Sequence, residues 1–241
     1  MENSTYGDII GSHDAPYINA LAHECGLAAN YSALSHPSLP NYVGMTSGST
    51  QGITDDGGPS EHPLSVPSIF SQLKGGWRAL DESMPSACDL RDASGYGVRH
   101  NPALYYTNIR GTCARRDVAL TSRPNVNARF TFITPNLCHD MHDCSTATGD
   151  TWLADFVPKV LRSHVYRAGK AVVFITWDEG SSDDNHIATL VLSRYTRPGT
   201  IAHKAFNHYS LLRTTEALLG IKAKLGQAAT AADMRAAFHL R

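Results

Sequence analysis

The sequence lacks any run of about 18 apolar residues, so no segment is predicted to span a membrane. It also lacks a block of basic residues and a stripe of aromatic and basic side chains, and its formal net charge is -1. A charge balance of this kind does not indicate nucleic acid or an anionic membrane as a partner. No feature of the sequence indicates an oligomeric state.

Internal repeats are absent too, and the composition is that of an ordinary globular protein. Hydrophobic residues make up 42% and charged residues 18% of the 241 residues. This length fits one large α/β domain with a sizeable core better than two small domains. We therefore expect a single domain over residues 1–241, with an insertion at about 81–124, where the secondary-structure signals are mixed.

Cysteine is scarce, and there is no Cys-x-x-Cys pair of the kind found in zinc sites. The positions of the five cysteines suggest two closed loops, Cys88–Cys113 and Cys138–Cys144, with Cys25 left over. Free thiols are the alternative. If the bridges form, the protein matures in an oxidising compartment, and we expect it to be secreted or periplasmic.

Apolar periodicity predicts alternating helices and strands. Strands are expected at 77–80, 129–134, 170–177 and 187–193, and helices at 14–25, 39–46, 151–166 and 210–219. Asp14 is the expected cap of the first helix, and the apolar run at 170–177 suits a central strand covered on both faces. The fold class indicated is α/β with a mostly parallel sheet.

One serine lies between two prolines just ahead of an apolar helical run. Pro37 and Pro40 disfavour a helix before them and tolerate its first turn, so the helix is expected to begin at Ser38. A hydroxyl there faces unpaired backbone N–H groups and the positive end of the helix dipole, where it can attack a phosphoryl group if its pKa is lowered. The alternative is an ordinary N-cap serine.

Acidic, amide and histidine side chains follow several predicted strands or loops. They are Glu2-Asn3, His139-Asp140-Met141-His142, Asp178-Glu179 and Asn207-His208. Because the carboxyl ends of parallel strands lie on one edge of a sheet, these groups could meet Ser38 there. Oxygen ligands would bind a divalent cation, and histidines could bind phosphate, hold a second metal or transfer protons.

Each of these groups also has a simpler interpretation. Asp178-Glu179 could be a helix cap with a solvated neighbour, and His208 a capping or packing group. The residues from His139 to His142 could form a polar loop. The case for His186 as a site residue is about as strong as that for His36. His36 is close to Ser38 in sequence without necessarily pointing the same way. Six other histidines are interpreted as surface residues: His13, His23, His62, His100, His164 and His203.

Taken together, five motifs resemble the bacterial phosphoesterase family, which holds non-specific phospholipases C and related acid phosphatases. The motifs cover nearly the whole chain in the family's order: Glu2-Asn3-x-x-Tyr6, His36-Pro37-Ser38-Leu39-Pro40-Asn41-Tyr42, Ile133-Thr134-Pro135-Asn136-x-x-x-Asp140-x-His142-Asp143, Trp177-Asp178-Glu179-Gly180, and His208 to Glu216. The resemblance implies an alkaline-phosphatase-like fold, a three-layer sandwich around a mostly parallel sheet. It also implies a serine or threonine nucleophile and a bound divalent metal.

Carried onto this chain, the resemblance implies that Ser38 is the nucleophile. The implied metal ligands are Glu2, Asn3, Asp178 and Glu179, and the implied substrate-binding residues are Asn41, His139, Asp140 and His186. His142 and His208 are the candidates for proton transfer. The metal could be Ca²⁺, Mg²⁺ or Mn²⁺ by its oxygen ligands, or Zn²⁺ by the histidines.

The resemblance implies hydrolysis of phosphoric esters through a phosphoseryl intermediate. The substrate would be a phosphomonoester or a small phosphodiester, because the chain is short for a phospholipase C of this type. Phospholipase C activity and a secreted metal- or phosphate-binding module without turnover are the alternatives. A serine esterase is disfavoured, since no Gly-x-Ser-x-Gly elbow surrounds Ser38. Relatives carry an apolar strand before the Glu-Asn pair, where Met1 stands here, so we expect Glu2 to sit on a chain end that could fray.

Overall fold

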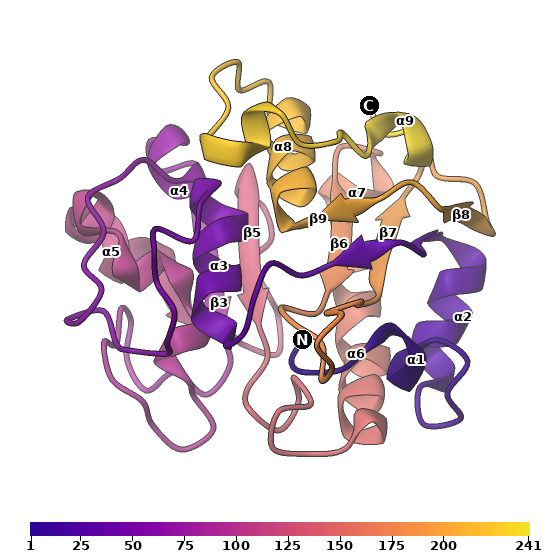
Figure 1. Cartoon of the computed structure of the whole chain (residues 1–241), viewed down its shortest axis with the longest axis horizontal. Coiled ribbons are helices and arrows are strands. Elements are labelled where there is room, and N and C mark those ends of the chain that lie inside the picture. Colours follow the sequence, from indigo (N-terminus) through magenta and orange to yellow (C-terminus); the bar gives the residue numbers. More distant parts are fainter.

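The computed structural model describes residues 1–241, and its strands fall into three groups with helices on both sides (Figure 1). The largest sheet has the strand order β6-β7-β1-β8, formed by Val172–Thr176, Thr189–Ser193, Gly26–Ala28 and Thr200–Ala202. The second sheet has the order β4-β3-β5, formed by Asp117–Ala119, Trp77–Asp81 and Phe130–Thr134. Two short strands, β2 (Tyr31–Ser32) and β9 (Phe206–Asn207), pair with each other.

Strand directions confirm the α/β class but make the central sheet mixed. Strand β3 runs parallel to both β4 and β5, and β1 runs parallel to β8. Strand β7 is antiparallel to its two neighbours, β6 and β1. The expectation of a mostly parallel sheet therefore holds for the β4-β3-β5 sheet and not for the β6-β7-β1-β8 sheet.

Helices cover both faces of the strands. Figure 1 shows α3 and α8 in front of the strands and α6 behind them; α3 contacts α8, and α6 contacts α2. The helix bounds are α1 Tyr6–Ile9, α2 Pro16–Glu24, α3 Ser38–Ser47, α4 Ile69–Gln72, α5 Arg110–Arg116, α6 Thr146–Leu161, α7 His164–Arg167, α8 His208–Leu218 and α9 Arg235–Phe238. Short 3₁₀ turns lie at 98–100, 102–105, 107–109 and 226–229. No helix has the length and hydrophobicity needed to cross a bilayer.

Both expected disulfides are present, Cys88–Cys113 and Cys138–Cys144, and Cys25 is free. The first bridge lies within the segment 81–124. This segment also supplies β4, which extends the second sheet, so it is more than a cover over one face.

Burial differs between strands of similar apolarity. Strand β7 is buried at every residue, as expected for a strand with a partner on each side. Strands β5 and β6 are mostly half-buried, and each has a hydrogen-bonded neighbour on one side only. The apolar run expected to be a central strand is therefore at the edge of its sheet.

Candidate active site

Ser38 is the first residue of α3 and is almost fully buried. Its Oγ lies 3.2 Å from Oε1 of Glu179 and 3.3 Å from Oε2 of Glu2. The N–H group of the next residue, Leu39, donates to Asp56 at 2.9 Å, so a carboxylate already binds at this helix N-terminus. The serine hydroxyl is thus held between two carboxylates that lie far apart in the sequence.

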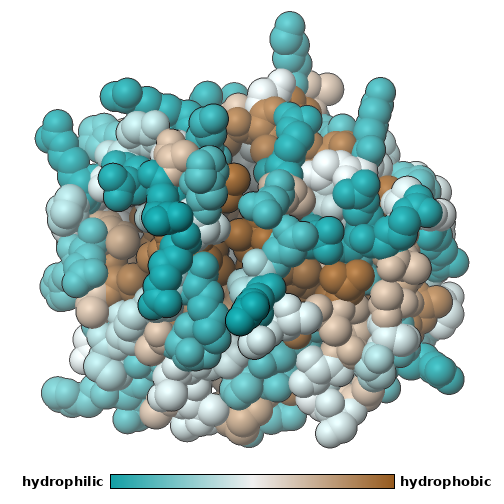
Figure 2. All heavy atoms as spheres, turned by 180° about the vertical axis from the view of Figure 1, so that it is seen from behind, coloured by the Kyte–Doolittle hydropathy of each residue, from teal (hydrophilic) through white to brown (hydrophobic).

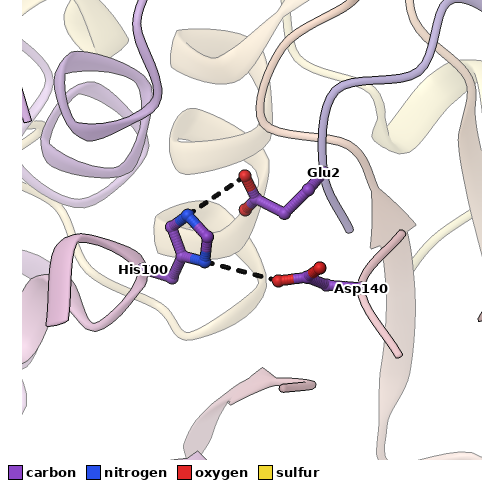
Figure 3. A group of neighbouring side chains, drawn as sticks. All are labelled: Glu2, His100 and Asp140. Carbon is purple, nitrogen blue, oxygen red and sulfur yellow. Dashed lines mark ion pairs between the residues drawn. The ribbon is translucent and has the colours of Figure 1, made fainter. Parts of the chain in front are cut away.

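A histidine that was expected at the surface lies at the centre of the site. His100 is 1% exposed, and its ring lies between two carboxylates (Figure 3). Its Nε2 is 3.2 Å from Glu2 Oε2, and its Nδ1 is 3.3 Å from Asp140 Oδ2. Neither the Nε2 of His100 nor the Oδ2 of Asp140 has a partner in hydrogen-bond geometry, which is the arrangement expected of ligand atoms around an ion.

Glu2 is fully buried and well held, rather than frayed at a chain end. Its main-chain N–H donates to the carbonyl of Asp140 at 2.8 Å, and its Oε1 accepts a hydrogen bond from Tyr42. Met1 also contributes, because its amino group donates to Thr176 at 3.1 Å. These contacts fix the Glu2 carboxylate beside Ser38.

Asp178 and Asn3 carry buried oxygens without partners. Both carboxylate oxygens of Asp178 and the Oδ1 of Asn3 lack a hydrogen bond within the protein. Burial raises the pKa of the Asp178 carboxyl above its usual range. Orphaned buried oxygens are rare in folded proteins and point to a missing positive partner.

The buried carboxylates perturb one another. Burial raises the pKa of Glu2 well above its usual range, and the charges of Asp178 and Asp140 raise it further. Burial also raises the pKa of Glu179 to about 7, with the Asp178 charge as the next cause. Several carboxylates this close cannot all be ionised in a dry site unless a cation neutralises them.

The donor set fits a divalent cation. Ligand atoms of Glu2, His100 and Asp140 lie within 4.8 Å of one another, and the unpartnered oxygens of Asp178 and Asn3 are candidates for further ligands. Carboxylate and amide oxygens suit Ca²⁺, Mg²⁺ or Mn²⁺, while the imidazole also suits Zn²⁺.

His36 contacts the opposite side of Glu179. Its Nδ1 lies 2.6 Å from Glu179 Oε2, and its ring is partly exposed. The two oxygens of Glu179 are therefore shared between His36 and Ser38. The oxygens of Glu179 are therefore less available to a cation than those of Asp178, which have no partner.

Asn41, expected to contact phosphate, uses its whole side chain to hold the loop before the nucleophile. Its Oδ1 accepts from the N–H groups of Leu34 (2.8 Å) and Ser35 (3.2 Å). Its Nδ2 donates to the carbonyls of Ser35 (2.8 Å) and Pro37 (3.1 Å). The structure therefore gives Asn41 a positioning role.

His208 is fully buried behind the site. One ring nitrogen, Nδ1, is 3.1 Å from the Tyr31 hydroxyl, and the other, Nε2, is 2.6 Å from the main-chain carbonyl of Asp178. Burial lowers the pKa of His208 to about 4. With both nitrogens engaged, this neutral ring positions Asp178 and does not reach the serine.

Two further candidate histidines have their partners outside the cluster. His139 pairs with Glu82 at 2.8 Å and stacks on Trp152. His186 contacts the carbonyl of Ala29 at 2.9 Å. Neither side chain contacts Ser38 or the carboxylates around it.

His142 lies at the outer side of the site, with its ring centroid 5.9 Å from that of His100. Its Nδ1 is 2.7 Å from Asp143, and its Nε2 is 3.1 Å from the Arg99 guanidinium. Arg99 in turn lies 3.9 Å from Asp56. These contacts bring the Arg99 guanidinium to the mouth of the site. No sequence motif indicated this residue.

The architecture places the chain in a known class. A solved protein of the alkaline phosphatase superfamily from Vibrio parahaemolyticus has the same fold, with a TM-score of 0.62 and 13% identity, over 99% of this chain and 70% of that one. The chain belongs to the Phosphoesterase family, whose sequence profile matches residues 10–222. The family resemblance seen in the motifs is thereby confirmed.

Two curated relatives support the same assignment. A phosphatidylinositol-3-phosphatase of Mycobacterium tuberculosis is 31% identical over 95% of this chain and 78% of its own. A phosphate-repressible acid phosphatase of Penicillium chrysogenum is 27% identical over 85% of this chain, which spans 54% of that relative's length. The protein is therefore a hydrolase acting on phosphoric ester bonds.

Proposed function

We propose that this protein hydrolyses phosphomonoesters or small phosphodiesters through a covalent phosphoserine on Ser38, with a divalent cation bound by the surrounding carboxylates. The observation that carries the proposal is the position of the Ser38 hydroxyl, buried at the N-terminus of α3 between Glu179 and Glu2. Glu2, Asp140, Asp178 and His100 would hold the cation, with Asn3 as a further ligand. When bound, it would increase the acidity of the hydroxyl and neutralise charge on the phosphoryl oxygens.

The reaction divides into two displacements. In the first, the Ser38 proton passes to Glu179, the Oγ–P bond forms, and the bond from phosphorus to the ester oxygen breaks on the opposite side. The ester oxygen leaves as an alkoxide and takes a proton from solvent. In the second, a water oxygen bonds to phosphorus as His142 accepts one of its protons, and the Oγ–P bond breaks to release phosphate. The proton held by Glu179 returns to Oγ and restores the serine hydroxyl, and His142 gives its proton to solvent. Asp143 at Nδ1 makes Nε2 the acceptor nitrogen of His142, and Arg99, which donates to this Nε2 at 3.1 Å, must release it before the nitrogen can accept the proton from water.

The deciding experiment replaces Ser38 with alanine in the metal-loaded protein and measures hydrolysis of p-nitrophenyl phosphate. We expect the rate to fall on the order of 10³-fold or more. The matched control is Ser35→Ala, since the Ser35 hydroxyl has no hydrogen-bond partner. A Ser38→Ala rate near that of the unmodified protein would show that another group is the nucleophile. EDTA separates this reaction from a metal-free serine esterase, which would keep its activity.

The substrate class needs a separate comparison. The relative from M. tuberculosis is named for a phosphorylated lipid headgroup, so phosphoinositide vesicles are tested beside aryl mono- and diesters. Release of a phosphorylated headgroup instead of phosphate would indicate phospholipase C activity. Phosphate binding without any turnover would indicate a binding module. The two disulfides support maturation in an oxidising compartment, which export of a tagged protein would test.

A further inference from the structure

Charged side chains, rather than apolar ones, mark the mouth of the site. Apolar residues, brown in Figure 2, are exposed in a hollow on the back of the molecule. At the mouth of the site, the side chains of Asp56 and Arg99 are 36% and 20% exposed. An anionic substrate that approaches Ser38 therefore meets a carboxylate and a guanidinium before it reaches the serine.

The Asp56 carboxylate occupies an anion position beside the nucleophile. Its Oδ1 accepts a hydrogen bond of 2.9 Å from the N–H group of Leu39, the residue that follows Ser38. This N–H group belongs to the first turn of α3, where the helix dipole favours negative charge. A phosphoryl group bonded to the Ser38 Oγ would bring its own oxygens to the same helix end, so the carboxylate and the phosphoryl group compete for it.

Arg99 is the only arginine or lysine whose side chain forms a hydrogen bond or ion pair with a residue at the site. Its Nη2 donates to Nε2 of His142 at 3.1 Å, and its Nε lies 3.9 Å from Oδ2 of Asp56. The other paired cationic side chains contact main-chain carbonyls or aspartates away from Ser38. A guanidinium binds phosphate oxygens more strongly than an uncharged nitrogen, so a phosphoryl group can take Arg99 from both of its present partners.

We propose that Asp56 competes with the phosphoryl group for the Leu39 N–H group and for Arg99, and thereby sets the affinity of the site for phosphate. Asp56 lies in the loop between α3 and α4 and has no other hydrogen-bond partner, so rotation of its side chain is enough to release both groups to the substrate. A tethered carboxylate acts at a high effective concentration, which keeps the product phosphate from binding tightly. The inference rests on the phosphoryl site proposed at Ser38.

The test measures the Kd of inorganic phosphate by isothermal titration calorimetry in MnCl₂. Asp56→Asn keeps an oxygen for the Leu39 N–H group but loses the charge, so it should bind phosphate about threefold more tightly. Asp56→Ala frees the N–H group as well and should bind phosphate about tenfold more tightly. Arg99→Met should have the opposite effect and bind phosphate about tenfold more weakly. The inhibition constant of phosphate against p-nitrophenyl phosphate should follow the same order.

The matched control is Asp55→Asn, because the Asp55 carboxylate contacts His62 and the Gly57 N–H group instead of the site. This control should leave the Kd of phosphate unchanged.

The proposal is overturned if Asp56→Ala binds phosphate no more tightly than the unmodified protein, since Asp56 would then only cap α3. Equal tightening in the Asp55→Asn control, or no phosphate binding by any form, would also overturn it. If Asp56→Ala does not fold, the sign of the change in Asp56→Asn decides, because the amide retains the cap. Phosphate binding needs no turnover, so these outcomes are separate from the Ser38→Ala result. Retained hydrolysis in Ser38→Ala would refute the nucleophile, whereas an unchanged Kd in the Asp56 variants would refute the competition.

Discussion

Replacing Asp178 with asparagine is expected to stabilise the metal-free protein and to abolish its stabilisation by a divalent cation. Asp178 is 1% exposed, and neither of its carboxylate oxygens has a partner in the protein. Its charge also raises the pKa of Glu2 and of Glu179. The amide is nearly the same size but carries no charge, so it relieves this repulsion while removing a ligand.

The magnitude follows from two opposing terms. An uncompensated buried charge costs on the order of 3 kcal/mol, whereas an unsatisfied buried amide costs about 1–2 kcal/mol. The expected net gain is therefore about 1–2 kcal/mol, or roughly 3–6 °C in Tm for a chain of this size. In the unmodified protein a cation at one hundred times its Kd should add about 2.7 kcal/mol, which the variant should lose.

The assay is thermal unfolding at pH 8, followed by circular dichroism in EDTA and in MnCl₂. Asp155→Asn is the matched control, because Asp155 is exposed and pairs only with Lys159 on the same helix. The control should respond to Mn²⁺ as the unmodified protein does. The reasoning fails if Asp178→Asn is less stable than the unmodified protein in EDTA, or if Mn²⁺ still raises its Tm.

Three further substitutions test buried polar groups. Asn41→Ala removes four hydrogen bonds, so the free energy of unfolding measured in urea should fall by about 2–4 kcal/mol. The substitution should also lower kcat more than it raises KM. An unchanged kcat would contradict the positioning role of Asn41. Burial raises the pKa of Asp117 to about 6, so the free energy of unfolding should fall by about 2 kcal/mol as pH rises from 4 to 6, and Asp117→Asn should flatten this profile. Burial lowers the pKa of His208 to about 4. The neutral ring therefore stabilises the folded protein above pH 6.5, and this stabilisation is lost as pH falls towards 4. If the free energy of unfolding of His208→Gln falls with the same slope between pH 6.5 and 4 as in the unmodified protein, this interpretation is refuted.

The sequence predicted those parts of the site that local chemistry determines. Pro37 and Pro40 restrict the backbone around Ser38, and α3 begins at that serine as expected. Asp178 and Glu179 follow an apolar strand, and the structure brings both near the serine end of α3. Strand content was predictable where apolar runs were long, but β1 and β8 have three residues each and carry too little periodicity to detect.

Long-range partners could not be predicted in this way. His100 lies in the segment 81–124, with nothing in its neighbourhood to distinguish it from a surface histidine, and it reaches Glu2 only through the tertiary fold. The cap of α2 is another example: Asp14 was expected, but Asp150 of α6 accepts from Tyr17 at 3.1 Å. A side chain far along the sequence can satisfy a helix end as well as a local one, and only the fold decides between them.

Neutral side chains hold the charged ones in place throughout this site. Asn41 fixes the loop before Ser38, His208 supports the backbone of Asp178, and Tyr42 donates to Glu2. None of these three adds charge to a cluster whose carboxylates already repel one another, so each can orient a ligand without competing for a cation. Substituting one of them should lower both stability and activity. Neutralising a carboxylate such as Asp178 should instead raise the stability of the metal-free protein and lower the activity. This opposition in sign would distinguish the residues proposed to bind the cation from those that position them, whichever phosphoric ester is the substrate.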